Sequence, residues 1–402
     1  MDTIKLTKSL GGMEVKKMYT RKKILCLISI LVLIFSSFTF STANEFDVDA
    51  KSAILIDAGT GKVLYEKDSH QKLPPASVTK IMTMLLTMEA IENKQITLED
   101  KVTISDHASS MGGSQLYLEP GEQRSVEQLI KGVAIASAND ACVALGEHIA
   151  GSEELFVKKM NEKAAELGMK NTQFINTNGL PAEGHYTSAY DISLMSRELL
   201  KHPKIHDWLT IWMSSMKVGK NGRSTLELTN TNKLIRFYPG ANGLKTGFTQ
   251  EAKFCLSASA KRNNFTLVAV VLGSPTSKIR FAAAKKLLDY GFSVYNSVQI
   301  AKKGQVIEGI NVEKGKGNTV NIVAKEDLRV LVKKGEEGDV KKEIILPETI
   351  KAPFDKGQKV GEINVTNSAG NNLGQVDLVT EVECKKASLF DTFKKIMKGI
   401  AN

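Results

Sequence analysis

The pairing of Ser77 with Lys80 is the arrangement in this sequence that is best suited to nucleophilic chemistry. Pro74 and Pro75 precede it, and such prolines favour the start of a helix directly after them, which puts Ser77 in the first turn. Free backbone N–H groups and the positive end of the helix dipole favour developing negative charge there. Lys80 follows at i+3 on the same face, so its amine is within reach of the serine hydroxyl. We expect a nucleophile and its base.

The helix that carries this pair is predicted to be buried at the centre of its domain. Apolar residues recur at helical spacing after Ser77, and no charged residue occurs over 81–88. A surface helix would carry charges on its outer face. A lysine that enters such an interior is the kind of amine that can lose its proton near neutral pH.

Two further motifs each occur once. Ser137-x-Asn139 lies between expected helices over 126–136 and 141–150, with Asn139 or Asp140 expected as the N-cap of the second. Lys245-Thr246-Gly247 suits a strand edge at which glycine lets a substrate backbone come close. Each motif alone has a structural explanation, as a helix cap or a solvated lysine. Another Ser-x-x-Lys, at Ser214 and Lys217, lacks the buried-helix context. The three motifs together, 60 and then 108 residues apart, are a strong signal.

Early strands, a helical middle and late strands predict an α/β domain whose sheet is completed as the chain returns. The late strands are expected at 226–230, 255–260 and 265–272, of which the last is almost wholly apolar and therefore central; a hairpin at 52–66 precedes them and a helix at 281–288 closes the domain. From about residue 297 short alternating strands predict a small β-sandwich. Its weak internal repeat relates 303–312 to 356–365.

The two ends of the chain read as a processing segment and a tail. A basic flank, an apolar run over 24–40 and small residues ending at Ala43 predict a signal peptide over 1–43, with an uncleaved membrane anchor as the alternative. Met13 and Met18 are alternative start sites. At the other end, residues 387–402 form an amphipathic pattern with lysines on one face. This pattern predicts an interfacial membrane anchor, and a helix that docks on a partner is the alternative.

Length and charge narrow the classes of function. A chain of 402 residues suggests two domains, over 44–295 and 296–386, besides the end segments. The net charge is +10, of which half lies in 1–43. No basic stripe with interleaved aromatic residues occurs, so we expect an anionic surface rather than nucleic acid as partner. The cysteines show no metal-ligand spacing, and we expect neither a metal nor a cofactor.

The three motifs in this order resemble the signature of penicillin-binding proteins and class A β-lactamases. The fuller stretches 75–80, 137–141 and 242–247 are most similar to low-molecular-mass penicillin-binding proteins, and among them to D-alanyl-D-alanine carboxypeptidases of serine peptidase family S11. The resemblance covers the chain from about Asp47 to its end. It implies a β-lactamase/DD-peptidase-like α/β (α+β) domain with an antiparallel sheet flanked by helices, a C-terminal all-β sandwich and a terminal amphipathic helix.

The resemblance also implies a chemistry. Ser77 attacks the peptide bond between the two terminal D-alanines of a peptidoglycan stem peptide, and Lys80 takes the serine proton. Burial and the nearby charge of Lys245 should both disfavour the protonated form of Lys80. Ser137 relays a proton to the leaving amine. The substrate-binding residues implied are Asn139 for the substrate amide, Lys245 and Thr246 for the terminal carboxylate, and Gly247 and Phe248 beside them, with the Phe248 and Ser77 N–H groups as oxyanion hole. Penicillin and other β-lactam antibiotics acylate Ser77 in the same way. From the predicted signal peptide we expect the protein to be exported, and to lie peripherally at the outer face of the cytoplasmic membrane or to be secreted.

Other functions fit less well. A class A β-lactamase relies on a Glu-x-x-Leu-Asn loop, and this string is absent from the sequence. A DD-transpeptidase differs only in the acceptor of the acyl group. A non-enzymatic wall-binding protein predicts a broken motif, whereas every motif residue is intact. His185 is the only histidine near a motif-rich loop, and we expect it to be structural.

Overall fold

The structure is a computed structural model that describes residues 18, 46–220, 222 and 224–391. The chain divides into two units, 1–47 and 48–402, and the fold lies in the second. Nearly all of the predicted signal peptide and most of the predicted terminal helix fall outside the described residues. Within the described part of the chain, no helix has both the length and the apolar character needed to cross a membrane.

A five-stranded antiparallel sheet forms the frame of the first domain, with strand order β2-β1-β9-β8-β7. Its strands are β1 (Ser52–Asp57), β2 (Val63–Lys67), β7 (Ala241–Thr249), β8 (Lys253–Arg262) and β9 (Phe265–Ser274). The apolar strand β9 lies in the middle, as its sequence predicts, because both of its faces are covered by helices. Strand β7, which carries the Lys-Thr-Gly motif, lies at an edge of the sheet.

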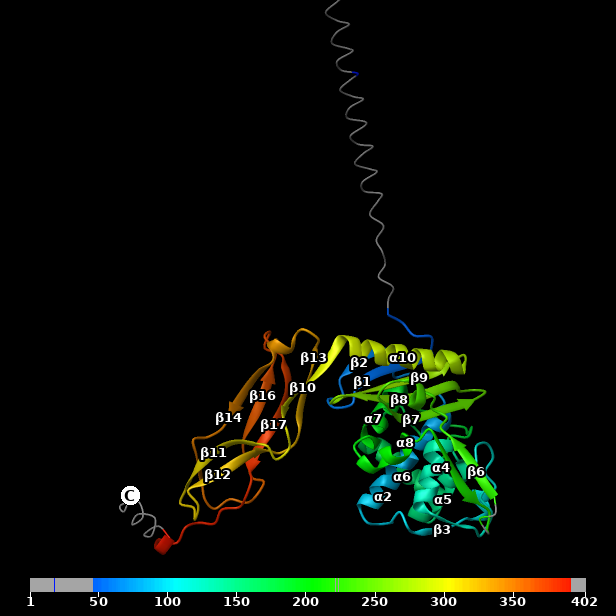
Figure 1. Cartoon of the computed structure of the whole chain (residues 1–402), viewed down its shortest axis with the longest axis horizontal. Helices are drawn as coiled ribbons and strands as arrows, with labels where there is room; N and C mark the ends of the chain where they lie inside the picture. The colour runs from blue at the N-terminus through cyan, green and yellow to red at the C-terminus, as the bar shows by residue number, and fades with distance from the viewer. Residues whose placement is uncertain (1–17, 19–45, 221, 223, 392–402) are drawn as a thin grey trace, which may run out of the picture. The chain divides into compact units, whose positions relative to one another are not determined.

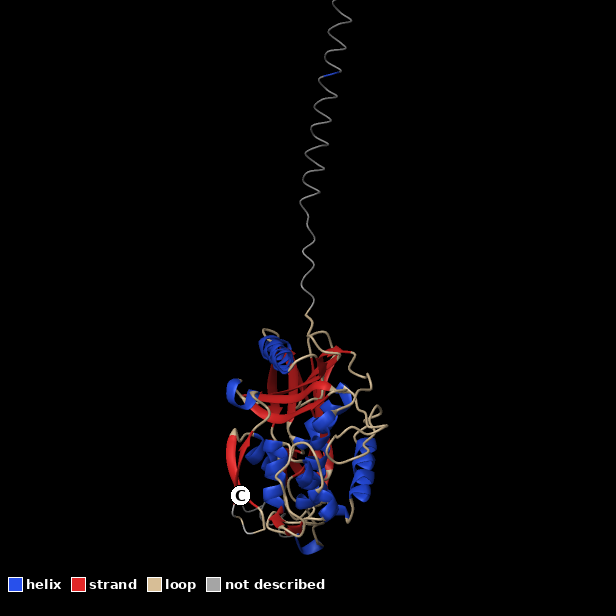
Figure 2. Ribbon diagram, turned by 90° about the vertical axis from the view of Figure 1, so that its right-hand side faces the viewer, coloured by secondary structure: helices blue, strands red, loops and turns tan. Residues whose placement is uncertain are grey.

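Helices cover both faces of this sheet. Figure 2 shows the sheet between the long helix α10 on one side and the main group of helices on the other. The helical segments are η1 (Ala76–Thr79), α2 (Lys80–Glu92), α3 (Asp106–Ser109), α4 (Val126–Ala136), α5 (Asn139–Ala150), α6 (Glu153–Glu166), α7 (Ala189–Leu199), η2 (Pro203–Ile205), α8 (His206–Leu209), α9 (Leu234–Phe237) and α10 (Ser277–Val294). Helix α10 contacts β8 and β9, and α7 contacts β1 and β9 from the opposite side.

Helix α2 is the buried central helix that the sequence predicts. Every residue from Lys80 to Met88 is buried, and α2 contacts α4, α5, α6, α7 and β7. The start of the helix differs from the prediction in detail. Ser77 lies in the 3₁₀ turn η1, and α-helical hydrogen bonding begins only at Lys80. The tighter turn keeps Ser77 and Lys80 close because 3₁₀ geometry places residues i and i+3 above one another.

Two other local predictions require correction. Helix α5 begins at Asn139, and its N-cap is Ala138, so neither Asn139 nor Asp140 is the cap. The Asp140 carboxylate instead accepts hydrogen bonds from the backbone N–H groups of Leu116 and Leu118. The strand expected over 226–230 lies outside the main sheet. Four strands form two separate two-stranded sheets, β3 (Lys101–Thr103) with β4 (Gln123–Ser125) and β5 (Met213–Val218) with β6 (Ser224–Thr229).

The C-terminal region is all-β, as predicted, apart from the short turn η3 (Glu337–Asp339). A six-stranded sheet has the order β14-β16-β17-β12-β11-β15, and a two-stranded sheet pairs β10 with β13 (Figure 1). The strands are β10 (Tyr295–Ala301), β11 (Val306–Glu313), β12 (Thr319–Ala324), β13 (Leu328–Lys333), β14 (Lys341–Ile345), β15 (Thr349–Lys351), β16 (Lys359–Thr366) and β17 (Asn372–Thr380).

The internal repeat of this region has a structural counterpart. Strands β11 and β16 each follow a Lys-Gly turn, and Gly304 and Gly357 both adopt the left-handed conformation that favours glycine. Ile363 and Leu378 are completely buried in the core that the strands share. Alternating burial along β11 and β16 fits strands that present one face to that core.

Candidate active site

Ser77 and Lys80 are in direct contact. The Lys80 Nζ donates a hydrogen bond to Ser77 Oγ at 3.0 Å and another to the carbonyl oxygen of Asn178 at 2.5 Å. Lys80 is completely buried. The structure therefore joins a serine hydroxyl to an amine that is shielded from water.

Burial is the main cause of an altered Lys80 titration. It lowers the pKa of Lys80 to about 8, although the negative charges of Cys142 and Asp140 oppose the shift when those groups are ionised. The expected repulsion between Lys80 and Lys245 lowers the pKa of Lys245 rather than that of Lys80. The pKa of Lys245 is well below its ordinary value, first because the side chain is buried and second because of the charge on Lys80.

The turn at residues 176–179 holds the base in place. The Asn178 carbonyl accepts a hydrogen bond from Lys80 Nζ, and the Thr177 carbonyl accepts one from Thr83 Oγ1, one turn further along α2. Gly179 has φ +86°, and a Cβ there would lie 1.9 Å from the carbonyl oxygen of Ala76. Only glycine therefore fits beneath the nucleophile turn.

A chain of hydrogen bonds joins His185 to this turn. The backbone N–H of Ile175 donates to His185 Nδ1 at 3.2 Å, so Nε2 carries the proton and donates to Thr79 Oγ1 at 2.9 Å. Thr79 in turn donates to the carbonyl of Ala76 at 2.9 Å. Ala76 has φ +48°, a conformation that costs free energy for any residue with a Cβ. His185 thus helps to hold the strained residue that precedes Ser77.

His185 keeps the neutral form that this chain requires. Burial, and secondarily the Lys80 charge, lower the pKa of His185 to about 4. The imidazole is therefore uncharged throughout the neutral range. This arrangement agrees with the structural role that the sequence predicts.

Strand β7 lies against the nucleophile turn at Gly247. A Cβ on Gly247 would lie 2.9 Å from the carbonyl oxygen of Pro75 and 3.1 Å from the Ser77 nitrogen. On its other side, the Gly247 carbonyl accepts a hydrogen bond from Arg280 Nη1 at 3.1 Å, and Arg280 also binds the Cys255 carbonyl. Arg280 thereby fixes the end of β7 relative to β8.

The two residues before Gly247 provide an amine and a hydroxyl. Lys245 is completely buried, and its Nζ donates to the Thr246 carbonyl at 3.3 Å. Thr246 Oγ1 donates to Thr231 Oγ1 at 2.7 Å. Among the described residues no carboxylate pairs with Lys245, so its ammonium form has no protein counter-charge.

Ser137 and Asn139 lie in the turn between α4 and α5. Ser137 is buried in a left-handed conformation with φ +66°, and no hydrogen bond joins its hydroxyl to Ser77 or Lys80 within the described chain. Asn139 Nδ2 donates to the Gly112 carbonyl at 2.6 Å. Its buried Oδ1 has no partner among the described residues, which leaves one acceptor for a ligand.

The other predicted positions lie as follows. Phe248 is 48% exposed, and its ring lies 4.5 Å from that of Phe254. The Ser-x-x-Lys at Ser214 lies on the hairpin strand β5, where Lys217 is exposed and donates to Thr225. The structure therefore separates this copy of the motif from the site.

Several contributors carry no recognisable sequence signal. Asn178 acts through its backbone, and Thr79 meets His185 across 106 residues. Arg280 lies in α10, which begins four residues earlier than the helix that the sequence predicts.

Comparisons with known proteins agree with this fold. The family model described as D-alanyl-D-alanine carboxypeptidase matches residues 39–276, and that of the penicillin-binding protein 5 C-terminal domain matches residues 295–386. Penicillin-binding protein 5 from Haemophilus influenzae superposes with a TM-score of 0.71 at 30% identity, over 85% of this chain and 99% of that one. The architecture is therefore that of a penicillin-binding protein.

Sequence relatives make the assignment narrower. D-alanyl-D-alanine carboxypeptidase DacF of Bacillus subtilis (strain 168) is 47% identical over 92% of this chain and 96% of its own. D-alanyl-D-alanine carboxypeptidase DacC of Escherichia coli (strain K12) is 35% identical over 87% and 88%. The chain belongs to the D-alanyl-D-alanine carboxypeptidase family, peptidase S11. The predicted family, fold class and kind of enzyme are thus confirmed.

Proposed function

We propose that this protein is a serine carboxypeptidase that removes the terminal D-alanine from peptidoglycan stem peptides through an acyl-enzyme on Ser77, and that β-lactam antibiotics acylate the same serine. The observation that carries the proposal is the 3.0 Å contact between Ser77 Oγ and the buried Lys80 Nζ. A pKa of about 8 leaves part of Lys80 neutral at physiological pH.

Acylation begins with a proton transfer. The neutral Lys80 amine keeps two N–H groups, one of which stays on the Asn178 carbonyl, and directs its lone pair at the Ser77 hydroxyl. As Oγ attacks the carbonyl carbon between the two D-alanines, its proton passes to Nζ. The C–N bond then breaks and the leaving amine takes a proton, for which Ser137 is the proposed relay.

The edge of β7 is the proposed substrate platform. Lys245 and Thr246 hold the terminal carboxylate, which supplies the counter-charge that the buried ammonium lacks. The Ser77 and Phe248 N–H groups form the oxyanion hole, consistent with the close approach of Gly247 to the Ser77 nitrogen. The free Oδ1 of Asn139 accepts the N–H of the substrate amide.

Deacylation returns the enzyme to its starting state. Water adds to the ester carbonyl, gives up a proton to the Lys80 amine, and the bond from the carbonyl carbon to Ser77 Oγ breaks as Oγ regains a proton. A β-lactam ring opens by the same attack. Because its leaving amine stays tethered to the acyl group, the acyl-enzyme is expected to persist.

The direct test is release of D-alanine from a peptide that ends in D-Ala-D-Ala. Wild-type protein should release one D-alanine per peptide, and Ser77→Ala should release none. Transfer of the acyl group to an added amine in preference to water would instead identify a transpeptidase. Rapid turnover of penicillin without D-alanine release would indicate a β-lactamase, and inertness towards both substrates would contradict the proposal.

We further propose that the enzyme is exported and lies at the outer face of the cytoplasmic membrane. The support is the sequence pattern of residues 1–43 and 387–402. Removal of residues 387–402 should release active enzyme into the soluble fraction. Membrane association that persists after this truncation would contradict the anchor.

A further inference from the structure

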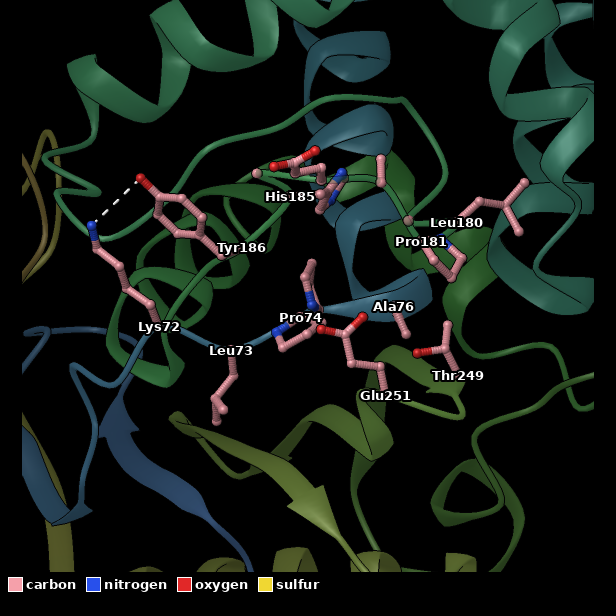
Figure 3. A pocket seen from close by; sticks show the side chains of 15 residues that line it. Lys72, Leu73, Pro74, Ala76, Leu180, Pro181, His185, Tyr186, Thr249 and Glu251 are labelled. Atoms are coloured by element: carbon pink, nitrogen blue, oxygen red, sulfur yellow. Dashed lines mark hydrogen bonds between the residues drawn. The ribbon is translucent and has the colours of Figure 1, made fainter.

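A cavity of about 620 Å³ opens directly beside the nucleophile turn (Figure 3). Its walls come from the segment 72–76, from the loop 179–186 and from the end of β7, which contributes Thr249 and, just beyond it, Glu251. The residues proposed above for the carboxylate and the leaving amine, Lys245, Thr246 and Ser137, do not line it. The cavity is therefore distinct from the leaving-group side of the site.

The cavity is lined by opposite charges that do not neutralise one another. Lys72, Glu183 and Glu251 line it, and none of the three forms an ion pair among the described residues. The Lys72 ammonium is instead held by Tyr186, with Nζ 3.4 Å from the hydroxyl and 4.5 Å from the ring centroid. In Figure 3 the Lys72–Tyr186 pair and the Glu251 carboxylate lie on separate sides of the opening.

The order of residues along β7 fixes which part of a substrate reaches this cavity. Lys245 and Thr246 come first, Gly247 lies against Ser77, and Thr249 borders the cavity two residues later. A peptide that runs antiparallel along this edge, with its carboxylate at Lys245, extends its earlier residues towards Thr249. At about 3.4 Å per residue, the residue before the two D-alanines comes level with the cavity.

We propose that this cavity is a specificity subsite for the side chain of the residue that precedes D-Ala-D-Ala, and that it selects a side chain bearing both an ammonium and a carboxylate. Glu251 binds the ammonium and Lys72 binds the carboxylate. Charge complementarity argues for this zwitterionic group: a side chain with an ammonium alone would leave Lys72 unmatched, and one with a carboxylate alone would leave the two glutamates unmatched. The proposal rests on the carboxypeptidase function proposed above.

The test compares kcat/KM for three peptides X-D-Ala-D-Ala, in which X is meso-diaminopimelate, L-lysine or Nε-acetyl-L-lysine. Wild-type protein should prefer diaminopimelate over lysine, and lysine over acetyl-lysine, by about two- to fivefold at each step, the scale of exposed charge pairs. Lys72→Met should abolish only the preference for diaminopimelate over lysine, because the side-chain carboxylate loses its partner. Glu251→Gln should abolish only the preference for lysine over acetyl-lysine, because the ammonium loses its partner.

Glu227→Gln is the matched control, because Glu227 is an exposed acid on β6 outside the cavity. It should keep both ratios at wild-type values. Equal kcat/KM for the three peptides in wild type, or ratios that survive both cavity substitutions, would overturn the subsite while leaving the carboxypeptidase function intact. Failure to hydrolyse any of the three peptides would instead contradict the function on which it rests. The ratios are insensitive to partial misfolding, since they compare substrates on one enzyme.

Discussion

The motif Ser-x-x-Lys occurs at Ser77 and again at Ser214, and these two copies have entirely different surroundings. At Ser77 a 3₁₀ turn leads into a buried helix, and Lys80 Nζ reaches the hydroxyl at 3.0 Å. At Ser214 the motif lies on strand β5, where residues three apart point to opposite faces. There Lys217 is exposed and binds Thr225 instead. The spacing thus supports chemistry only where helical geometry aligns the pair and burial lowers the amine pKa.

The largest expected contrast comes from the two lysines. Lys80→Arg should lower the rate of penicillin acylation by about 10²- to 10⁴-fold, because a guanidinium cannot release its proton to become a base. Lys217→Arg should leave the rate unchanged. Stopped-flow acylation with a fluorescent penicillin measures both. Equal loss in the two variants would mean that the substitutions act through folding rather than through the base.

A second contrast concerns the support beneath the nucleophile turn. Gly179→Ala should reduce acylation by about 10²-fold, since displacing the turn by about 1 Å misplaces the hydroxyl. Gly121→Ala is the matched control: Gly121 also has a positive φ, +74°, but its Cβ would meet nothing within 4 Å. Both variants share the backbone strain and differ in the clash with Ala76. Comparable activity of the two variants, measured alongside their melting temperatures, would contradict the support role.

The pH dependence tests the proposed state of the base. Below pH 8 the acylation rate should rise about tenfold per pH unit and then level off, because only the neutral amine accepts the Ser77 proton and the Lys80 pKa is about 8. His185 does not contribute to this profile, as its pKa of about 4 keeps it neutral. A rate that is already constant from pH 6 upward would show that Lys80 is not the titrating base.

The smallest expected effect compares two equally buried histidines. His185→Ala should lower the acylation rate about three- to tenfold with little change in binding, because Thr79 loses the donor that helps to hold Ala76. His202, also 7% exposed, pairs with Glu92 at the far end of α2. His202→Ala should reduce thermal stability without this kinetic effect. His185→Gln, which keeps an N–H donor, should recover part of the lost rate.

The contrast between the Ser77 and Ser214 motifs also explains how much of the fold and of the site could be predicted from the sequence. The three motifs, the buried helix, the central strand β9 and the β repeat follow from local periodicity and composition, and the structure contains each of them. Local pattern also ruled out Ser214, because its lysine lacks an apolar continuation. These features depend on residues that are close in sequence.

Features built from distant residues could not be predicted in this way. The Asn178 carbonyl reaches Lys80 across 98 residues, and any residue type supplies a carbonyl. The predicted N-cap of α5 is wrong for a related reason: Asn139 and Asp140 already lie inside the helix after Ala138, and the Asp140 carboxylate accepts the N–H groups of the distant residues Leu116 and Leu118. The role of Arg280 could not be predicted, because its partners are the backbone carbonyls of Gly247 and Cys255, which produce no sequence pattern around residue 280.

The most direct measurement is the position of the covalent bond that penicillin forms. Peptide mapping by mass spectrometry after incubation with penicillin should find one adduct per chain, on the peptide that contains Ser77. The Ser214→Ala variant should be labelled like wild type, and Ser77→Ala should not be labelled at all. An adduct on any other residue of the wild-type protein, or undiminished labelling of Ser77→Ala, would contradict the account.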